Sequence, residues 1–184
     1  MEQNLENTFA LLERTPRALD GLLRGLPEAW TMRNEGGKTF TAHDVIGHLI
    51  HGERADWIVR AKMILEFGET KAFERFDRVA HVKECEGKSM EGLLEEFAGL
   101  RAANLVEVRG WKLGAAELGK RGRHPGFGTV TLSELLATWA AHDMTHLHQI
   151  SRILAHQYRE FVGPWSVYLG VLQCAGHSAA PVEK

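Results

Sequence analysis

The sequence has few cysteines and no pairing pattern among them. Its 184 residues include two cysteines, Cys85 and Cys174, which stand far apart and outside any CxxC motif. We therefore expect two free thiols rather than a disulfide framework. Neither cysteine has an obvious base beside it in the sequence, so a nucleophilic thiol is not favoured.

Long apolar runs and an excess of positive charge are also missing. No stretch approaches the roughly twenty apolar residues that a membrane span requires, and residues 1–14 lack the basic and then apolar order of a signal peptide. We expect a cytoplasmic protein outside the membrane. With 22 basic and 24 acidic residues, the chain has no surplus of cations for nucleic-acid phosphates.

The composition is that of an ordinary globular protein, with 44% hydrophobic and 25% charged residues. This length is enough to bury a hydrophobic core without a second domain. The sequence therefore predicts one domain over residues 1–184.

Apolar residues recur at spacings of three and four in four segments. This periodicity predicts helices over residues 5–26, 41–67, 89–108 and 131–154. Thr41, Ser89 and Thr131 are good N-cap residues for the last three. Pro16 should kink the first helix or restart it at Thr15.

No stretch of useful length alternates with the two-residue period of a strand. The predicted fold is therefore all-α, an up-and-down four-helix bundle with long connections and a C-terminal apolar tail. The tail, residues 163–173, is expected to pack back on the bundle. The connection 69–88, with Phe73 and Phe76 as anchors, is long enough to form a lid or a wall of a site.

The predicted fourth helix contains a pair of histidines on its apolar side. His142 and His146 are four residues apart, which on a helix separates them by about 40° and one turn, so both rings point at a common place. Trp139 and Ile153 continue the same buried stripe. Because unpartnered imidazoles are costly to bury, the pair indicates a metal site. His148 lies about 200° from His146 and should face elsewhere.

A third ligand is expected from the predicted second helix, since a divalent ion usually takes at least three protein ligands. We favour His48, with Asp44 one turn before it as a hydrogen-bond acceptor and Gly52 one turn after it allowing close approach. His51 lies only about 60° away on the same helix, so periodicity leaves it as an alternative. Glu53 and Asp143 are expected to be solvated or helix-capping charges, with a role beside the metal as the lesser alternative for both.

Two phrases, "TAHDVIGHLIHGE" and "HPGFGTVTLSELLATWAAHDMTHLHQI", resemble the DinB-like superfamily of proposed metalloenzymes, which is related to bacterial thiol-dependent S-transferases. The resemblance covers residues 5–160. It implies a four-helix bundle in which His48, His142 and His146 bind one divalent metal ion, zinc or nickel. One departure is "HLHQ" where many members read "HRGQ", which adds His148 near the site.

Three neutral imidazoles would leave the charge of the ion uncompensated, which lowers the pKa of a bound water towards about 7 or stabilises a thiolate. With the resemblance, this favours S-transfer from a low-molecular-weight thiol cofactor to a small electrophilic substrate. A metal-dependent hydrolase and a non-catalytic, stress-related metal-binding or ligand-binding protein are the alternatives. No residue is assigned a catalytic role.

The tail offers aromatic side chains for association. Trp165 and Tyr168, together with Leu169, are candidate anchors of a homodimer interface, and bundles of this resemblance often form homodimers.

Overall fold

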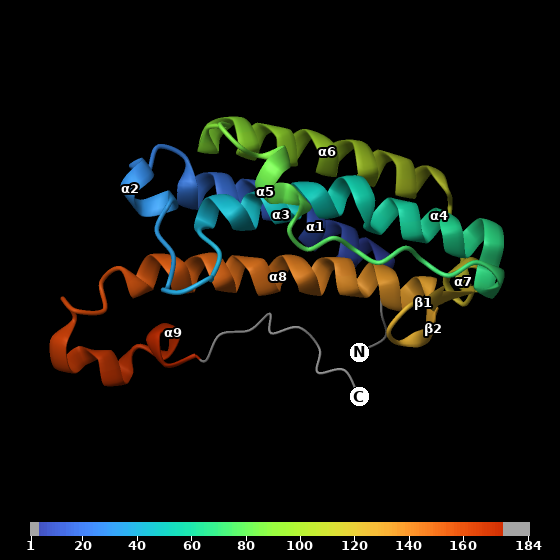
Figure 1. Ribbon diagram of the computed structural model, residues 1–184. Coiled ribbons are helices and arrows are strands. Elements are labelled where there is room, and N and C mark those ends of the chain that lie inside the picture. The colour runs from blue at the N-terminus through green and yellow to red at the C-terminus, as the bar shows by residue number, and fades with distance from the viewer. Residues whose placement is uncertain (1–3, 175–184) are drawn as a thin grey trace.

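Four long helical segments make up most of residues 4–174, the part of the chain that the computed structural model describes (Figure 1). They are α1 (Leu5–Leu23), the consecutive helices α3 (Ala42–Ala55) and α4 (Trp57–Phe67), α6 (Met90–Gly110) and α8 (Leu132–His156). Shorter elements accompany them: α2 (Glu28–Thr31), η1 (Gly68–Thr70), α5 (Ala80–Glu84), α7 (Ala115–Leu118), β1 (Arg121–His124), β2 (Gly128–Thr131), η2 (Gly163–Tyr168) and α9 (Gly170–Gln173). No helix in the described range has the length and apolar character needed to cross a membrane.

The predicted helix starts are confirmed by their caps. Thr41 and Asp44 form a capping box, in which each backbone N–H donates to the side chain of the other. Ser89 accepts from the N–H of Gly92, and Thr131 forms a second capping box at the start of α8. These bonds satisfy N–H groups that the first helical turn leaves without partners.

The expected restart of the helix at Thr15 is wrong, because α1 continues through Pro16. Proline cannot donate to the carbonyl four residues before it, which is that of Leu12. In the structure the Leu12 carbonyl accepts a 2.8 Å hydrogen bond from Nη1 of Arg101 on α6. A partner from another helix thus replaces the missing bond.

The sequence predicted one helix over residues 41–67, but the structure has two helices that meet at Asp56. This residue ends α3 and precedes α4, with φ −116° and ψ −77°. Its carboxylate pairs with Arg60 one turn later at 2.5 Å. Nothing in the apolar periodicity signals the break, because the stripe of buried residues continues across it.

A two-stranded hairpin precedes α8, although the sequence pattern predicted no strand. Strands β1 and β2 pair antiparallel, with Arg121 opposite Thr131 and His124 opposite Gly128. Gly122 packs so tightly that a Cβ there would lie 2.6 Å from Cγ1 of Ile64. The strands were missed because segments of four residues are too short to show a two-residue period.

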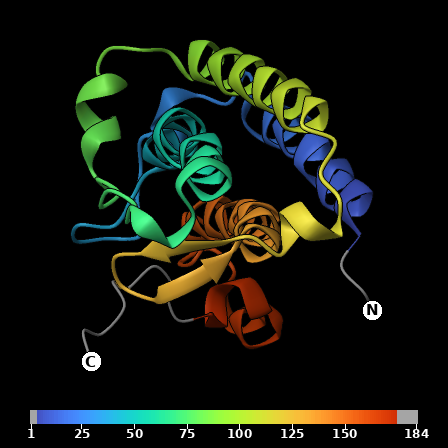
Figure 2. The same cartoon turned by 90° about the vertical axis from the view of Figure 1, so that its right-hand side faces the viewer.

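The predicted up-and-down order of the helices is also wrong, because α3 and α6 run in the same direction. His43, at the start of α3, bonds the Lys88 carbonyl just before α6, and Glu53, near the end of α3, bonds Asn104 far along α6. The connection 71–79 carries the chain back along the bundle to α5, as Figure 1 shows. Viewed along the bundle (Figure 2), α6 contacts α1 and α3, and α8 contacts the same two helices. A long crossover connection permits this arrangement.

The core consists of two clusters of buried apolar side chains with a polar layer between them. The cluster near the hairpin contains Phe9, Leu12, Trp57, Ile58, Ala61, Ile64, Phe73, Leu105, Val108, Leu132, Leu135, Leu136, Trp139 and Ala140. The other contains Leu19, Leu23, Ala42, Val45, Ile46, Leu49, Ile50, Cys85, Met90, Leu93, Leu94, Phe97, Ile150 and Ile153.

Arg101 is the centre of the polar layer and is fully buried. Its guanidinium donates to both carboxylate oxygens of Asp143, at 2.6 and 2.9 Å, and to Glu53 at 2.9 Å. Glu53 also accepts from the indole N–H of Trp139 at 2.8 Å. Asp143 and Glu53 are only 0% and 3% exposed, so the expectation that they are solvated is wrong. A buried charge needs such partners to offset its loss of hydration.

The tail was expected to pack on the bundle, but its aromatic side chains do not. Trp165 is 69% exposed and Tyr168 is 80% exposed, whereas α9 lies against α8. Exposed aromatic side chains of this kind suit an interface, and the homodimer stays a prediction. Residues 175–184 lie outside the described range.

We expect Arg101→Met to lower the free energy of unfolding by about 3–5 kcal/mol, because it leaves two buried carboxylates without their cation. Urea denaturation monitored by circular dichroism measures the change. Arg109→Met is the matched control on the same helix: the exposed pair of Arg109 with Glu13 should contribute less than about 1 kcal/mol. Equal losses in the two variants would contradict the central role of Arg101.

Candidate metal centre

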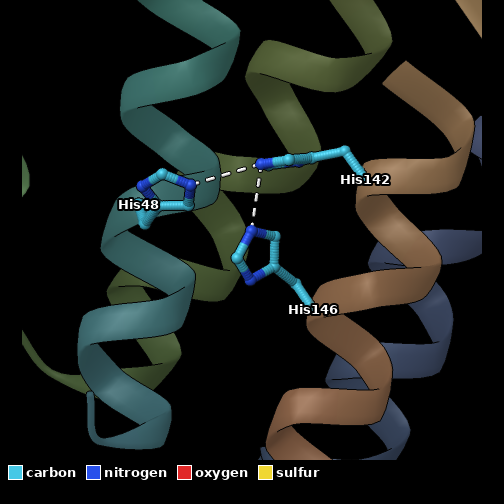
Figure 3. A group of neighbouring side chains, drawn as sticks. All are labelled: His48, His142 and His146. Atoms are coloured by element: carbon cyan, nitrogen blue, oxygen red, sulfur yellow. Dashed lines mark hydrogen bonds between the residues drawn. The ribbon is translucent and has the colours of Figure 1, made fainter. Parts of the chain in front are cut away.

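Three histidines meet between α3 and α8. His48 projects from α3, and His142 and His146 project from α8, with their rings converging (Figure 3). Nε2 of His142 lies 3.2 Å from Nε2 of His48 and 3.0 Å from Nε2 of His146. The structure thus brings together the three residues that the sequence predicted as ligands.

One of these rings has its proton position set by a neighbour. Nδ1 of His146 lies 2.8 Å from the side-chain oxygen Oε1 of Gln149, one turn later on α8. Because an amide oxygen only accepts, Nδ1 must carry the proton. Nε2 of neutral His146 therefore has a lone pair directed at the other two rings.

The protein environment keeps the other two rings neutral. Burial, followed by the nearby rings of His146 and His81, lowers the pKa of His48 to about 3. Burial also lowers the pKa of His142 to about 2, with His146 and His48 as the next causes. A neutral imidazole has one N–H and one lone pair, as metal binding requires.

No placement of the remaining protons satisfies this group of three rings. If Nε2 of His142 carries a proton, it can donate to His146 but cannot accept from His48. If Nε2 of His142 is unprotonated, it can accept from His48 but faces the lone pair of His146. One of the two short contacts is unfavourable in either case, and a cation among the three nitrogens removes the conflict.

The geometry fits a divalent ion. Zinc lies about 2.0–2.1 Å from histidine nitrogen, so the nitrogens of a tetrahedral site are about 3.3 Å apart. The two Nε2 contacts of His142, at 3.2 and 3.0 Å, are close to this spacing, and all three ligand atoms lie within 4.8 Å of one another. Among the described residues this group has three members, which leaves a coordination position for water or substrate.

Aromatic side chains contact two of the three rings. Trp57 meets the His142 ring edge to face, with centroids 5.1 Å apart, and Phe76 meets the His48 ring in the same way at 5.6 Å. Phe76 belongs to the connection 71–79, which runs along the outside of the bundle from η1 to α5 (Figures 1 and 2). Phe73 on the same connection is buried, as expected of an anchor. The connection therefore forms a wall of the site, as its length suggested.

Other residues considered from the sequence have different roles. His51 does not join the three rings, because its Nδ1 bonds Glu84 at 3.0 Å. His148 is exposed and faces away, as predicted. The proposed role of Asp44 in orienting His48 is wrong, because the Asp44 carboxylate caps α3. Nδ1 of His48 is buried without a hydrogen-bond partner among the described residues. Gly52 admits the Trp57 indole rather than a helix or ligand, since a Cβ there would lie 3.2 Å from Nε1.

The sequence reasoning missed the ionic group behind the site. Asp143 follows His142 directly, and its partner Arg101 also lowers the pKa of His142. A signal was present, because Asp143 is one turn after buried Trp139 on a helix and so lies near the buried stripe. A charged residue on that stripe needs a partner of opposite charge.

Comparisons with known proteins agree with the fold. A sequence model described as the DinB superfamily matches residues 11–150. A solved structure titled "YfiT from Bacillus subtilis is a probable metal-dependent hydrolase with an unusual four-helix bundle topology" is 19% identical, covers 88% of this chain and 89% of that chain, and superposes with a TM-score of 0.72. None of the curated proteins compared with this chain matches it.

Replacing a facing histidine should abolish tight metal binding. We expect one zinc or nickel ion per chain in the loaded protein, and loss of that ion in His48→Ala, His142→Ala and His146→Ala. His51→Ala should keep it, because His51 bonds Glu84 instead. Metal analysis after dialysis and titration calorimetry measure binding. Loss of the ion in His51→Ala alone would show that the ligand on α3 is wrongly assigned.

The metal-free protein should lose stability in acid. The pKa values of His48 and His142 are about 3 and about 2 in the folded state, below about 6.5 in the unfolded chain. The unfolded state therefore binds more protons below pH 6.5, and stability falls by about 1.4 kcal/mol per pH unit for each ring as pH drops towards 3.

Urea denaturation of chelator-treated protein across this pH range measures the slope. A double variant, His48→Gln with His142→Gln, should show a shallower slope. An unchanged slope would contradict the burial of two neutral rings.

Proposed function

The chain belongs to the DinB superfamily, and from this membership and its three facing imidazoles we propose that it is a metal-dependent enzyme acting on a small electrophile. The observation that carries the proposal is the group of Nε2 atoms that ring protons alone cannot satisfy. Hydrolysis is the favoured reaction, in line with the description of the solved Bacillus subtilis relative.

The residues of the site suit this chemistry. A divalent ion with three neutral ligands supplies Lewis acidity and a nucleophile at neutral pH. Gln149 holds His146 with its lone pair on Nε2. Trp57 and Phe76 pack against the His142 and His48 rings in T-shaped contacts, and excluding water around a reacting group strengthens its electrostatic interactions.

Thiol-dependent S-transfer is the second candidate. The same neutral donor set favours a thiolate, so a low-molecular-weight thiol would serve as the nucleophile in place of water. A non-catalytic metal-binding or ligand-binding protein is the third. Whether water or a thiol is the nucleophile depends on which of the two molecules can reach the three rings.

We expect zinc- or nickel-loaded protein to hydrolyse members of a panel of activated esters and amides, with loss of turnover in His142→Ala. A parallel panel of cytosolic thiols with chlorodinitrobenzene and epoxides tests S-transfer. His148→Ala, an exposed change on the same helix, is the matched control and should keep turnover.

Metal-dependent thiol consumption without hydrolysis would favour the transferase. Full turnover in His142→Ala, or none in either panel with fully loaded protein, would contradict an enzymatic role for this centre.

A further inference from the structure

His51 and Glu84 form a hydrogen-bonded pair beside the three facing histidines. The short helix α5 lies along α3, so that His81 meets the His48 ring with centroids 5.7 Å apart, and Glu84, three residues later, bonds His51. The two oxygens of Glu84 lie 3.0 and 3.3 Å from Nδ1 of His51. The contact of His81 with His48 and that of Glu84 with His51 are therefore about one helical turn apart along α3 and α5.

The contact with Glu84 selects one tautomer of His51. A carboxylate only accepts, so Nδ1 of His51 carries the proton and donates it. Nε2 then has the lone pair and is free to accept a proton. Arg54 lies 3.6 Å from the other oxygen of Glu84, which holds the carboxylate in place. A histidine oriented by a carboxylate in this way is a common arrangement for a general base.

His51 lies on the same side of α3 as the ligand His48. The two residues are three positions apart, which corresponds to a rise of about 4.5 Å and a turn of about 60°. Both rings contact Phe76, with centroid separations of 5.6 Å for His48 and 4.9 Å for His51. The connection 71–79 therefore covers the two histidines together.

We propose that His51 is the proton acceptor of the reaction and that Glu84 is the positioning residue that holds it in the productive tautomer. The assignment rests on the proposed function, which requires a nucleophile to lose a proton. Nε2 of His51 takes the proton as the O–H or S–H bond of the nucleophile breaks and its electron pair attacks the substrate. The imidazolium, stabilised by Glu84, then returns the proton to the leaving group, which restores neutral His51.

Several charged or titratable groups surround His51 and contribute to its environment. They are Glu84 and His81 of α5, His48 and Arg54 of α3, and Asp56 at the end of α3. Glu84 is the one that bonds the ring, so its removal should affect the tautomer more than removal of any other.

The first experiment reads the tautomer of His51 by NMR of the imidazole nitrogens in zinc-loaded, histidine-labelled protein at neutral pH. We expect a proton on Nδ1 and none on Nε2, and a mixture of tautomers in Glu84→Gln. A proton on Nε2 of His51 in the unmodified protein would overturn the proposal. This measurement needs no substrate.

The second experiment counts protons when acetohydroxamic acid, which binds metal ions as an anion, is added to zinc-loaded protein. Calorimetry in buffers of different ionisation enthalpy gives the number released to solvent. His51→Gln should release about one more proton per chain than the unmodified protein, because no base retains it. His148→Gln should match the unmodified protein, and equal counts in all three would overturn the proposal.

Turnover and metal content complete the test. For any substrate found in the panels, His51→Gln should reduce kcat by about a hundred- to ten-thousand-fold, while Glu84→Gln moves the acidic limb of the pH profile. Both variants should keep their zinc, and loss of zinc in His51→Gln would make His51 a ligand and overturn the assignment. If loaded protein binds no hydroxamate and turns over no substrate, the proposed function fails, whereas the tautomer still decides the role of Glu84.

Discussion

The buried guanidinium of Arg101 is the interaction on which the arrangement of the four helices depends. It projects from α6 and bonds the Leu12 carbonyl of α1, Glu53 of α3 and Asp143 of α8, all at 2.6–2.9 Å. Burial alone would lower the pKa of Arg101, but its bonds and charge interactions with Asp143 and Glu53 outweigh this and raise the pKa. Because one planar group has a partner on every other long helix, the helices cannot shift relative to one another without leaving a charge unpaired. Even the proline in α1 takes part, since Pro16 leaves the Leu12 carbonyl available to Arg101.

This ionic group belongs to a polar layer that separates two apolar clusters, and the facing histidines lie at the side of that layer between α3 and α8. The position has an electrostatic consequence. Arg101 lies close enough to His142 to lower the pKa of that ring, which helps to keep the imidazole neutral and able to bind a metal. The group that holds the helices together thus also helps to keep a neutral donor at the three rings.

Much of this site could be predicted from the sequence, since its signals are local. A four-residue spacing places His142 and His146 side by side on any helix, and cap residues such as Thr41 mark helix starts. The pairing of Asp143 with Arg101 could not be predicted, because it joins α6 and α8 and depends on how distant segments pack. The parallel course of α3 and α6 was missed for the same reason: it is set by the path of connection 71–79, which has no periodicity. The short strands of the hairpin are defined by pairing with each other rather than by their own pattern.

Helical periodicity alone does not distinguish His48 from His51 as the ligand, whereas the packing of α5 does. The two positions differ by about 60° around α3, so the apolar stripe accommodates either ring towards α8. What separates them is α5, a helix of five residues too short to be recognised from its sequence. It places Glu84 beside His51, and this carboxylate accepts the Nδ1–H of that ring. A carboxylate holds an imidazole by its N–H, whereas a metal ion takes the lone pair of a ring that lacks such a partner on the metal side. One turn of α3 therefore presents two histidines with opposite roles, and the neighbouring helix determines which is which.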